Sequence, residues 1–262
     1  NVQRKVSLAV RFDAGGRIEN IGFCGVPQKV GETYNFYMFA KSEKPMKLQL
    51  IVGNENDICA ELEIHSVEYQ CYRASYTAKK NCKDGKFYLL SPEGGELHIG
   101  FISLMPAETF RGHGLRRDIA EMLENIHPSF LRFPGGCIVE GFTPSTAMRF
   151  KDTVGPVWER PGHLLMWHYR SFDGMGFHEY LQFCEDIGME PLYVCNCGIT
   201  CQARKEMFMT GQALDEMLQD VLDAIEYAIG TPDTKWGALR AKMGHPAPFK
   251  MNYIEIGNEN WG

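Results

Sequence analysis

The sequence predicts an α/β plus all-β protein, with a jelly-roll-like β-sandwich over residues 1–106 and a parallel α/β part over residues 107–262. Two observations support this prediction. Before residue 106, short runs alternate polar and apolar residues, and no segment keeps a helical period for three turns. From about Phe110, strands alternate with amphipathic helices, which is typical of βαβ units and a parallel sheet.

The composition is that of a globular protein and argues against several classes of function. Of 262 residues, 44% are hydrophobic and 23% are charged, so the chain can bury a sizeable core. The net charge is −6 and no run is rich in lysine or arginine, which argues against nucleic acid and anionic membranes as partners. No apolar stretch approaches the ~18 residues of a membrane span. We therefore expect no nucleic-acid partner and no membrane insertion.

Six strands are predicted in the first part, all rich in β-branched and aromatic residues. Turn signals such as those at residues 13–16 and 83–85 separate them. The predicted strands cover residues 5–12, 33–42, 47–53, 60–69, 86–91 and 96–104. Short strands joined by tight turns pair antiparallel, which favours a sandwich of jelly-roll type.

The second part is predicted to contain three helices and three strands. Apolar residues recur at helical spacing, and proline or glycine ends each helix. The predicted helices cover 115–126, 177–187 and 214–229, the strands 129–136, 191–198 and 249–259, and a long loop 137–173. Three parallel strands leave an open edge, so we expect part of a larger barrel or doubly wound sheet, with a tendency to form homo-oligomers.

Polar residues gather at the predicted strand ends, where parallel α/β folds place their functional groups. Side-chain alternation places Arg132 on the inner face of its strand and Glu255 and Glu259 together on the inner face of theirs. Two acids and an arginine would then lie close together at the carboxyl ends of the strands. The alternative is a structural ion pair between Arg132 and Glu255, with Glu259 as a solvated strand end.

The nine cysteines form no regular disulfide framework, so reduced and buried thiols are expected. The densest group is Cys195, Cys197 and Cys201. Zinc would require four ligands, whereas this run supplies three at an unusual spacing and without an obvious histidine. We therefore expect no metal and no cofactor, although a small redox or metal protein built on these three cysteines remains an alternative.

Trp167 lies in the predicted long loop and has two interpretations. An aromatic side chain in such a loop either anchors the loop or presents a flat face to a sugar ring. The adjacent sandwich favours carbohydrate as the ligand.

Four runs of sequence then carry a resemblance to a known family. They are FLRFPGGCIVEGF (130–142), DTVGPVWERPGH (152–163), DGMGFHEYLQFCEDIGMEPLYV (173–194) and YIEIGNE (253–259). In order and spacing they resemble the α-L-arabinofuranosidases of glycoside hydrolase family 51. The resemblance implies a (β/α)8 TIM barrel, of which this chain supplies about strands two to four, preceded by a carbohydrate-binding-module-like sandwich. It also implies an arabinose-containing oligosaccharide or polysaccharide as the partner.

The resemblance implies roles for five residues of this sequence. Glu259 would be the general acid/base of a retaining enzyme that releases terminal α-L-arabinofuranosyl residues, and Asn258 would hydrogen-bond the sugar. Arg132 would help to hold the acidic and sugar groups in the site. Cys137 would line the sugar pocket, and Trp167 would pack over the bound arabinose.

The second carboxylate of a retaining pair is not found. The two carboxyl groups should stand about 5–5.5 Å apart, whereas Glu255 lies roughly 13 Å from Glu259 along the same strand at ~3.3 Å per residue. We therefore expect a truncated form that lacks the nucleophile and the first barrel strand and is inactive alone. The alternative function is a non-catalytic carbohydrate-binding protein. The compartment is not predicted, since the cysteines favour a reducing one and the family leaves the periplasm or secretion open.

Overall fold

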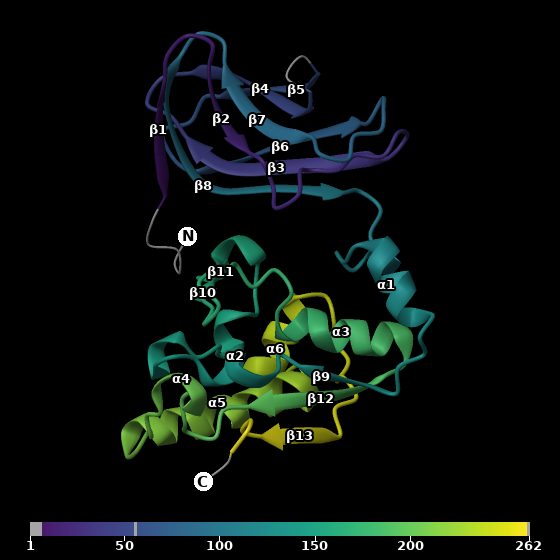
Figure 1. The fold of residues 1–262 in the computed structure, drawn as a ribbon, viewed down its shortest axis with the longest axis vertical. Coiled ribbons are helices and arrows are strands. Elements are labelled where there is room, and N and C mark those ends of the chain that lie inside the picture. The colour runs from purple at the N-terminus through teal and green to yellow at the C-terminus, as the bar shows by residue number, and fades with distance from the viewer. Residues whose placement is uncertain (1–6, 55–56, 261–262) are drawn as a thin grey trace. The chain divides into compact units, whose positions relative to one another are not determined.

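The computed structural model describes residues 7–54 and 57–260. The chain forms two compact units, Asn1–Arg116 and Arg117–Gly262, which we name the sandwich unit and the barrel unit (Figure 1). The sequence predicts the division after residue 106, which is ten residues before the boundary at Arg116. The backbone N–H of Ala107 still donates to Thr33 O of the sandwich, at 2.8 Å. Residues 5–6 of the first predicted strand lie outside the described residues.

Eight antiparallel strands form the two sheets of the sandwich unit. One sheet has the order β1-β8-β3-β6 and the other the order β2-β7-β4-β5. Two four-stranded sheets with these orders make a jelly roll, so the predicted fold is confirmed. The strands are β1 (Leu8–Phe12), β2 (Gly16–Asn20), β3 (Thr33–Lys41), β4 (Met46–Gly53), β5 (Ile58–Ile64), β6 (Gln70–Thr77), β7 (Lys86–Ser91) and β8 (Gly95–Pro106).

The core of the sandwich unit lies between the two sheets. On β3, Phe36, Met38 and Ala40 are buried and alternate with more exposed neighbours, as the period-2 pattern predicts. Two observed strands, β2 and β6, were not predicted. Both are edge strands of their sheets. β2 carries mostly polar residues, so its hydrophobic alternation is weak, whereas β6 does alternate Tyr72, Ala74 and Tyr76 with polar residues, and the prediction overlooked this pattern.

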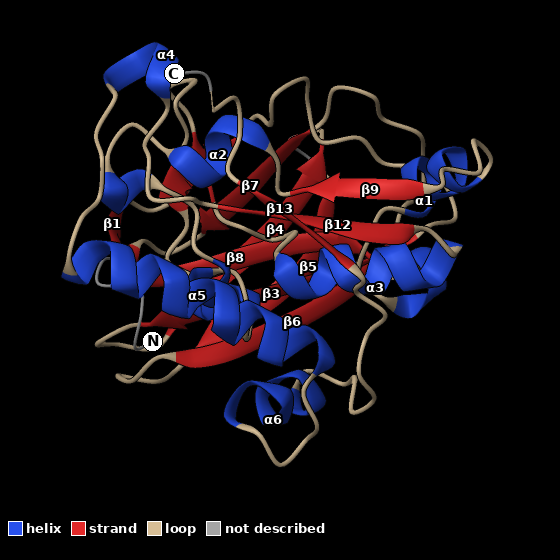
Figure 2. Cartoon of the chain, turned by 90° about the horizontal axis from the view of Figure 1, so that it is seen from below, coloured by secondary structure: helices blue, strands red, loops and turns tan. Residues whose placement is uncertain are grey.

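Three parallel strands form the sheet of the barrel unit, in the order β13-β12-β9 (Figure 1), and Figure 2 shows them in red from below. They are β9 (Phe130–Phe133), β12 (Glu190–Cys195) and β13 (Tyr253–Ile256). Strands that follow one another in the chain are neighbours in the sheet, as in a (β/α)8 barrel. Helix α3 (Phe177–Ile187) covers one face of the sheet, where the ring of Tyr180 stacks on that of Phe133 with centroids 4.9 Å apart.

The three predicted helices form, and three further helices that were not predicted accompany them. The helices are α1 (Arg117–Glu124), α2 (Gly136–Glu140), α3, α4 (Gln202–Lys205), α5 (Gln212–Ile229) and α6 (Lys235–Lys242). The expected loop at 137–173 is wrong in part, because it contains most of α2, η2 (Pro144–Thr146), η3 (Phe150–Asp152), η4 (Val157–Glu159), β10 (His163–Leu164) and β11 (Arg170–Ser171). Elements of two to five residues are too short to show a hydrophobic period.

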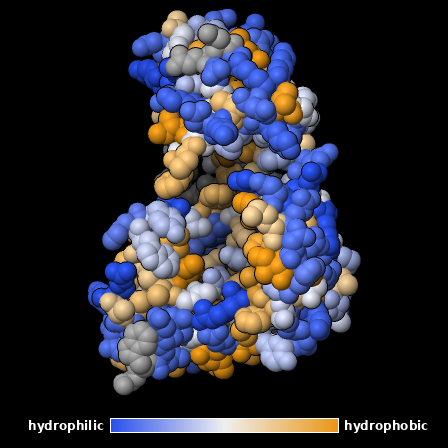
Figure 3. Space-filling view, turned by 45° about the vertical axis from the view of Figure 1, so that its right-hand side comes forward, coloured by the Kyte–Doolittle hydropathy of each residue, from blue (hydrophilic) through white to orange (hydrophobic). Residues whose placement is uncertain are grey.

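Several apolar side chains of the barrel unit are exposed. They include Met122 of α1, Leu218 of α5 and Ile256 of β13, and Figure 3 shows hydrophobic residues among the hydrophilic ones on the surface. Ile256 is uncovered because β13 is an edge strand and no described helix lies over it. Among the residues that the structure describes, no helix is both long enough and apolar enough to cross a membrane.

Candidate functional site

The carboxyl ends of β9, β12 and β13 lie at one edge of the sheet because the strands are parallel. Leu192 of β12 lies opposite Arg132 on one side, and Val194 lies opposite Glu255 on the other. Leu192 and Val194 are two residues apart and therefore share a face, so Arg132 and Glu255 lie on that same face. The structure thus places Arg132 and Glu255 where the alternation predicted them. The prediction for Glu259 is wrong, because β13 ends at Ile256 and Glu259 lies in the turn that follows it.

Arg132 and Glu255 form a bidentate ion pair across β12. Arg132 Nε and Nη2 each donate to a carboxylate oxygen of Glu255 at 2.6 Å, and Nη2 also donates to Asn258 Oδ1 at 2.9 Å. The hydrogen bonds from Arg132 lower the pKa of Glu255, and the same bonds raise the pKa of Arg132. Glu255 is therefore ionised at neutral pH, and Arg132 connects it to Asn258.

A tight turn after β13 exposes Glu259. Gly257 has φ +79° and Glu259 has φ +47°, so both occupy the left-handed region that non-glycine residues rarely adopt. A Cβ on Gly257 would lie 2.3 Å from Asn260 Nδ2 and 2.8 Å from Cys197 Sγ, so only glycine fits. Strained residues of this kind cluster at functional sites, which supports a functional role for Glu259.

Asn258 is held between the ion pair and helix α2. Its side chain is 7% exposed, and its Oδ1 accepts from Arg132. A Cβ on Gly136 would lie only 3.4 Å from Asn258 Oδ1, so the start of α2 packs directly on the carboxamide. Among the described residues, Asn258 Nδ2 has no hydrogen-bond acceptor. One donor of the carboxamide is therefore fixed in place and unused.

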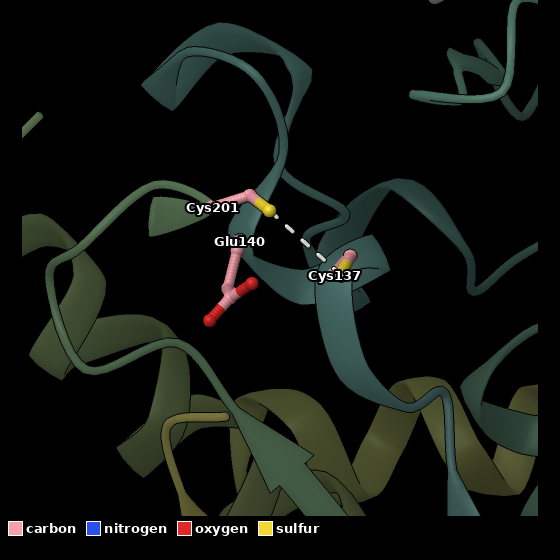
Figure 4. Close-up of side chains that lie close together, drawn as sticks. All are labelled: Cys137, Glu140 and Cys201. Carbon is pink, nitrogen blue, oxygen red and sulfur yellow. Dashed lines mark hydrogen bonds between the residues drawn. The ribbon is translucent and has the colours of Figure 1, made fainter. Parts of the chain in front are cut away.

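Beside Asn258, three further side chains form a cluster that we name the thiol cluster: Cys137, Glu140 and Cys201 (Figure 4). Their ligand atoms all lie within 4.8 Å of one another, and the Cys201 thiol donates to Cys137 Sγ at 3.8 Å. Two hydrogen bonds join α2 and its end to the loop after β12. Cys201 N donates to the Gly141 carbonyl at 3.0 Å, and the Asn196 side chain donates to the carbonyl of Val139 in α2 at 2.7 Å.

Burial shapes the electrostatics of the thiol cluster. Burial raises the pKa of Glu140, which is 4% exposed, and the carboxylate of Glu259 raises it further. The side chains of Asn258 and Cys201 lower the pKa of Glu140. The Asn258 Nδ2 group does this without a hydrogen bond of normal geometry to the carboxylate. Burial likewise raises the pKa of Cys137, to about 11, with a second contribution from the hydrogen bond to Cys201. Cys137 is therefore a neutral thiol at pH 7.

The other two cysteines of the predicted group lie elsewhere. All nine cysteines are free thiols, as expected, but only Cys184, Cys195 and Cys201 are buried, so the expected burial is wrong for the other six. Cys201 pairs with Cys137, whereas Cys197 donates to Asn260 Oδ1 at 3.5 Å and Cys195 is buried at the end of β12. Among the described residues, Cys195, Cys197 and Cys201 do not form a shared ligand set.

Trp167 lies in the turn between β10 and β11 and is 47% exposed. The ring of the next residue, His168, lies 6.2 Å from that of Phe142, which follows α2. This contact ties the turn to the segment that carries the thiol cluster. Within the described part of the chain, no hydrogen bond or ring contact joins Trp167 itself to Arg132, Asn258 or Glu259.

Sequence reasoning missed Glu140 and the pairing of Cys201 with Cys137. A glutamate that follows the apolar run Cys137-Ile138-Val139 was a signal for Glu140, since a buried acid needs partners. No comparable signal existed for Cys201, which lies 64 residues from Cys137 in the chain.

Comparisons with known proteins identify relatives of this chain. The family described as the alpha-L-arabinofuranosidase 1 domain matches residues 122–262. Alpha-L-arabinofuranosidase 1 of Arabidopsis thaliana is 36% identical over 256 residues, covering 95% of this chain and 37% of its own length. The extracellular exo-alpha-L-arabinofuranosidase of Streptomyces chartreusis is 34% identical, covering 94% and 32%.

A solved structure gives a similar result for the fold. The arabinose-bound MgGH51 α-L-arabinofuranosidase superposes with a TM-score of 0.88 at 30% identity, over 97% of this chain and 43% of that one. The present chain thus spans about a third of the length of the two curated relatives and less than half of the solved one.

Proposed function

The chain belongs to the α-L-arabinofuranosidase family, glycoside hydrolase family 51, and on that premise we propose that it is part of a retaining glycoside hydrolase. The enzyme would release terminal α-L-arabinofuranosyl residues from arabinose-containing polysaccharides or oligosaccharides. This activity is proposed for a longer protein that contains this chain and has the full length of the relatives, and not for residues 1–262 alone. The observation that carries it is that the family match, residues 122–262, contains the whole strand-end arrangement of Arg132, Asn258 and Glu259.

Glu259 is the proposed general acid/base. In the first step its carboxylic acid donates a proton to the departing glycosidic oxygen, and in the second its carboxylate takes a proton from the attacking water. The turn after β13 exposes Glu259 beyond the sheet edge, where a substrate can reach it. The geometry of Arg132, Glu255 and Glu259 also fits the purely structural alternative, and family membership favours catalysis.

Asn258 and Arg132 are the proposed positioning groups. The unused Nδ2 donor of Asn258 is suited to a sugar hydroxyl, while its Oδ1 is held by Arg132. Glu255 neutralises Arg132 and fixes its orientation. Cys137 is proposed to line the sugar pocket next to this group, and Trp167 to pack over the sugar from the β10–β11 turn.

The nucleophile is proposed to come from another part of the enzyme. Both carboxylate oxygens of Glu255 accept hydrogen bonds from Arg132, so Glu255 is unsuited to attack an anomeric carbon. We propose that the second carboxylate lies in sequence that the relatives have outside the part aligned with this chain. Residues 1–262 alone would then release no arabinose.

The sandwich unit is proposed to be a carbohydrate-binding-module-like appendage, a role that its jelly-roll topology supports. For the 262-residue chain by itself, pairing of the edge strand β13 is a proposed route to homo-oligomers.

The test compares leaving groups in a protein of the relatives' length. With Glu259→Gln, hydrolysis of methyl α-L-arabinofuranoside should fall by ~10²–10⁴-fold, because a poor leaving group depends on the proton that Glu259 donates. The first step with 4-nitrophenyl α-L-arabinofuranoside, followed by the burst of nitrophenol, should be nearly unchanged. Glu206→Gln is the matched control, since Glu206 is exposed at the end of α4 and precedes Glu259 by 53 residues in the chain.

An equal loss for both substrates would contradict the acid/base assignment. Absence of arabinofuranosidase activity in the unsubstituted protein, with activity on another glycoside, would overturn the substrate class instead.

A further inference from the structure

The thiol cluster has the composition and geometry of a metal site. We propose that Cys137, Glu140 and Cys201 bind a thiophilic divalent cation of the Zn²⁺ class, with one carboxylate oxygen and two thiolates that form as the thiol protons are released to water. The inference stands on the geometry of these three residues and does not depend on the proposed glycosidase activity.

The separation of the two sulfur atoms matches a tetrahedral metal site. Zn–S bonds are about 2.3 Å long, and the edge of a tetrahedron built on such bonds is about 3.8 Å. The Cys137 and Cys201 sulfur atoms are 3.8 Å apart. A disulfide would instead require about 2.05 Å. The two thiols therefore already stand at the distance that a shared metal ion requires.

Glu140 completes a three-ligand set with little movement. A sulfur–oxygen edge in such a site is about 3.5 Å, from bonds of about 2.3 and 2.0 Å. All three ligand atoms already lie within 4.8 Å of one another (Figure 4). Rotation of the Glu140 carboxylate would shorten its oxygen–sulfur distances to those of the metal site. The fourth position of the tetrahedron would be open to water or another small ligand.

The ligands are held in place before any ion binds. Cys201 is 2% and Glu140 is 4% exposed, so neither side chain is free to reorient widely. The hydrogen bond from Cys201 N to Gly141 O and the one from Asn196 to Val139 O fix the loop against α2. A site whose ligands are positioned in this way binds with a smaller entropic cost. The partial exposure of Cys137 leaves an entry path for the ion.

Co²⁺ titration of the reduced 262-residue chain tests the proposal. Tetrahedral Co²⁺ with two thiolates gives intense visible ligand-field bands and sulfur-to-cobalt charge-transfer bands in the near ultraviolet. We expect these bands to saturate at a single equivalent and to disappear on addition of Zn²⁺. Cys137→Ser and Cys201→Ser should each abolish them, and Glu140→Gln should weaken binding by at least ~10-fold.

Cys197→Ser is the matched control, because Cys197 lies in the same loop but bonds Asn260. Its bands should equal those of the parent chain. Alkylation mapping by mass spectrometry gives a readout that needs no variant: Zn²⁺ should protect the partly exposed Cys137 from iodoacetamide and leave the exposed Cys24 unprotected. Bands that persist in both serine variants, bands lost in Cys197→Ser, or equal alkylation of Cys137 with and without Zn²⁺ would each overturn the proposal.

Discussion

Replacing Arg132 by methionine removes the side chain that connects β9 to the turn after β13. The substitution deletes two hydrogen bonds to the Glu255 carboxylate and one to Asn258 Oδ1. Methionine keeps much of the aliphatic length, so the change isolates the charge and the hydrogen bonds from the packing. We expect a less stable barrel unit.

The size of the loss follows from the exposure of the pair. An exposed ion pair contributes ~0.2–1 kcal/mol, and breaking a buried one costs ~3–5 kcal/mol. The side chains of Arg132 and Glu255 are 36% and 33% exposed, so water can solvate the abandoned carboxylate in part. The free energy of unfolding should therefore fall by about 2 kcal/mol, between these limits.

Urea unfolding followed by tryptophan fluorescence measures this change. All four tryptophans, at positions 158, 167, 236 and 261, follow residue 116, so their fluorescence reports the barrel unit. Arg117→Met is the matched control. Arg117 pairs with Glu121 at 3.3 Å, but the two side chains are 54% and 50% exposed, so the loss should stay below ~0.5 kcal/mol.

A double-mutant cycle with Glu255→Gln completes the test. The coupling energy between Arg132 and Glu255 should be ~1–2 kcal/mol, because each single substitution removes the same ion pair. A coupling energy near zero, or an Arg132→Met loss no larger than that of Arg117→Met, would refute the reasoning.

Three further predictions use the same unfolding assay. Gly257→Ala should lower the free energy of unfolding by ~2–3 kcal/mol, because the added Cβ meets two side chains at a positive φ. Gly188→Ala, at a similar φ of +76° but in open space, should lower it by only ~1 kcal/mol. Equal losses would contradict the steric argument. Because its arginine partner lowers the pKa of Glu255, this group stabilises the barrel unit above the unfolded-state pKa, and the contribution is lost as the pH falls through the folded-state pKa. A Glu255→Gln chain should therefore lose less stability than the parent as the pH falls below ~4.3, and parallel curves would contradict this. Arg160→Met should cost ~3–5 kcal/mol, because the fully buried arginine is the ion-pair partner of Glu179; a loss below ~1 kcal/mol would be inconsistent with that burial.

Much of the fold could be predicted from hydrophobic periodicity. The strand β3 and the helices α3 and α5 have long, regular patterns, and each forms where its pattern predicts. The edge strand β2 was missed because its mostly polar residues carry little alternation, whereas β6 was missed although its buried tyrosines alternate with polar residues.

The parts of the site that could be predicted are those that follow from the alternation of side chains along one strand. Alternation along a strand places Arg132 and Glu255 on the inner face without knowledge of distant residues. The thiol cluster is different, because Cys201 meets Cys137 through the packing of α2 on the loop after β12, across 64 residues of chain. Such a contact depends on tertiary structure, and the local sequence around either cysteine does not indicate it.

Rescue by azide tests the central assignment, Glu259 as acid/base, most directly. In a protein of the relatives' length, Glu259→Ala should slow turnover of 4-nitrophenyl α-L-arabinofuranoside by ~10²–10⁴-fold, since water is no longer activated. Azide needs no general base, so it should restore nitrophenol release and yield α-L-arabinofuranosyl azide with retained configuration. If azide neither accelerates the variant nor appears in the product, the assignment of Glu259 is contradicted.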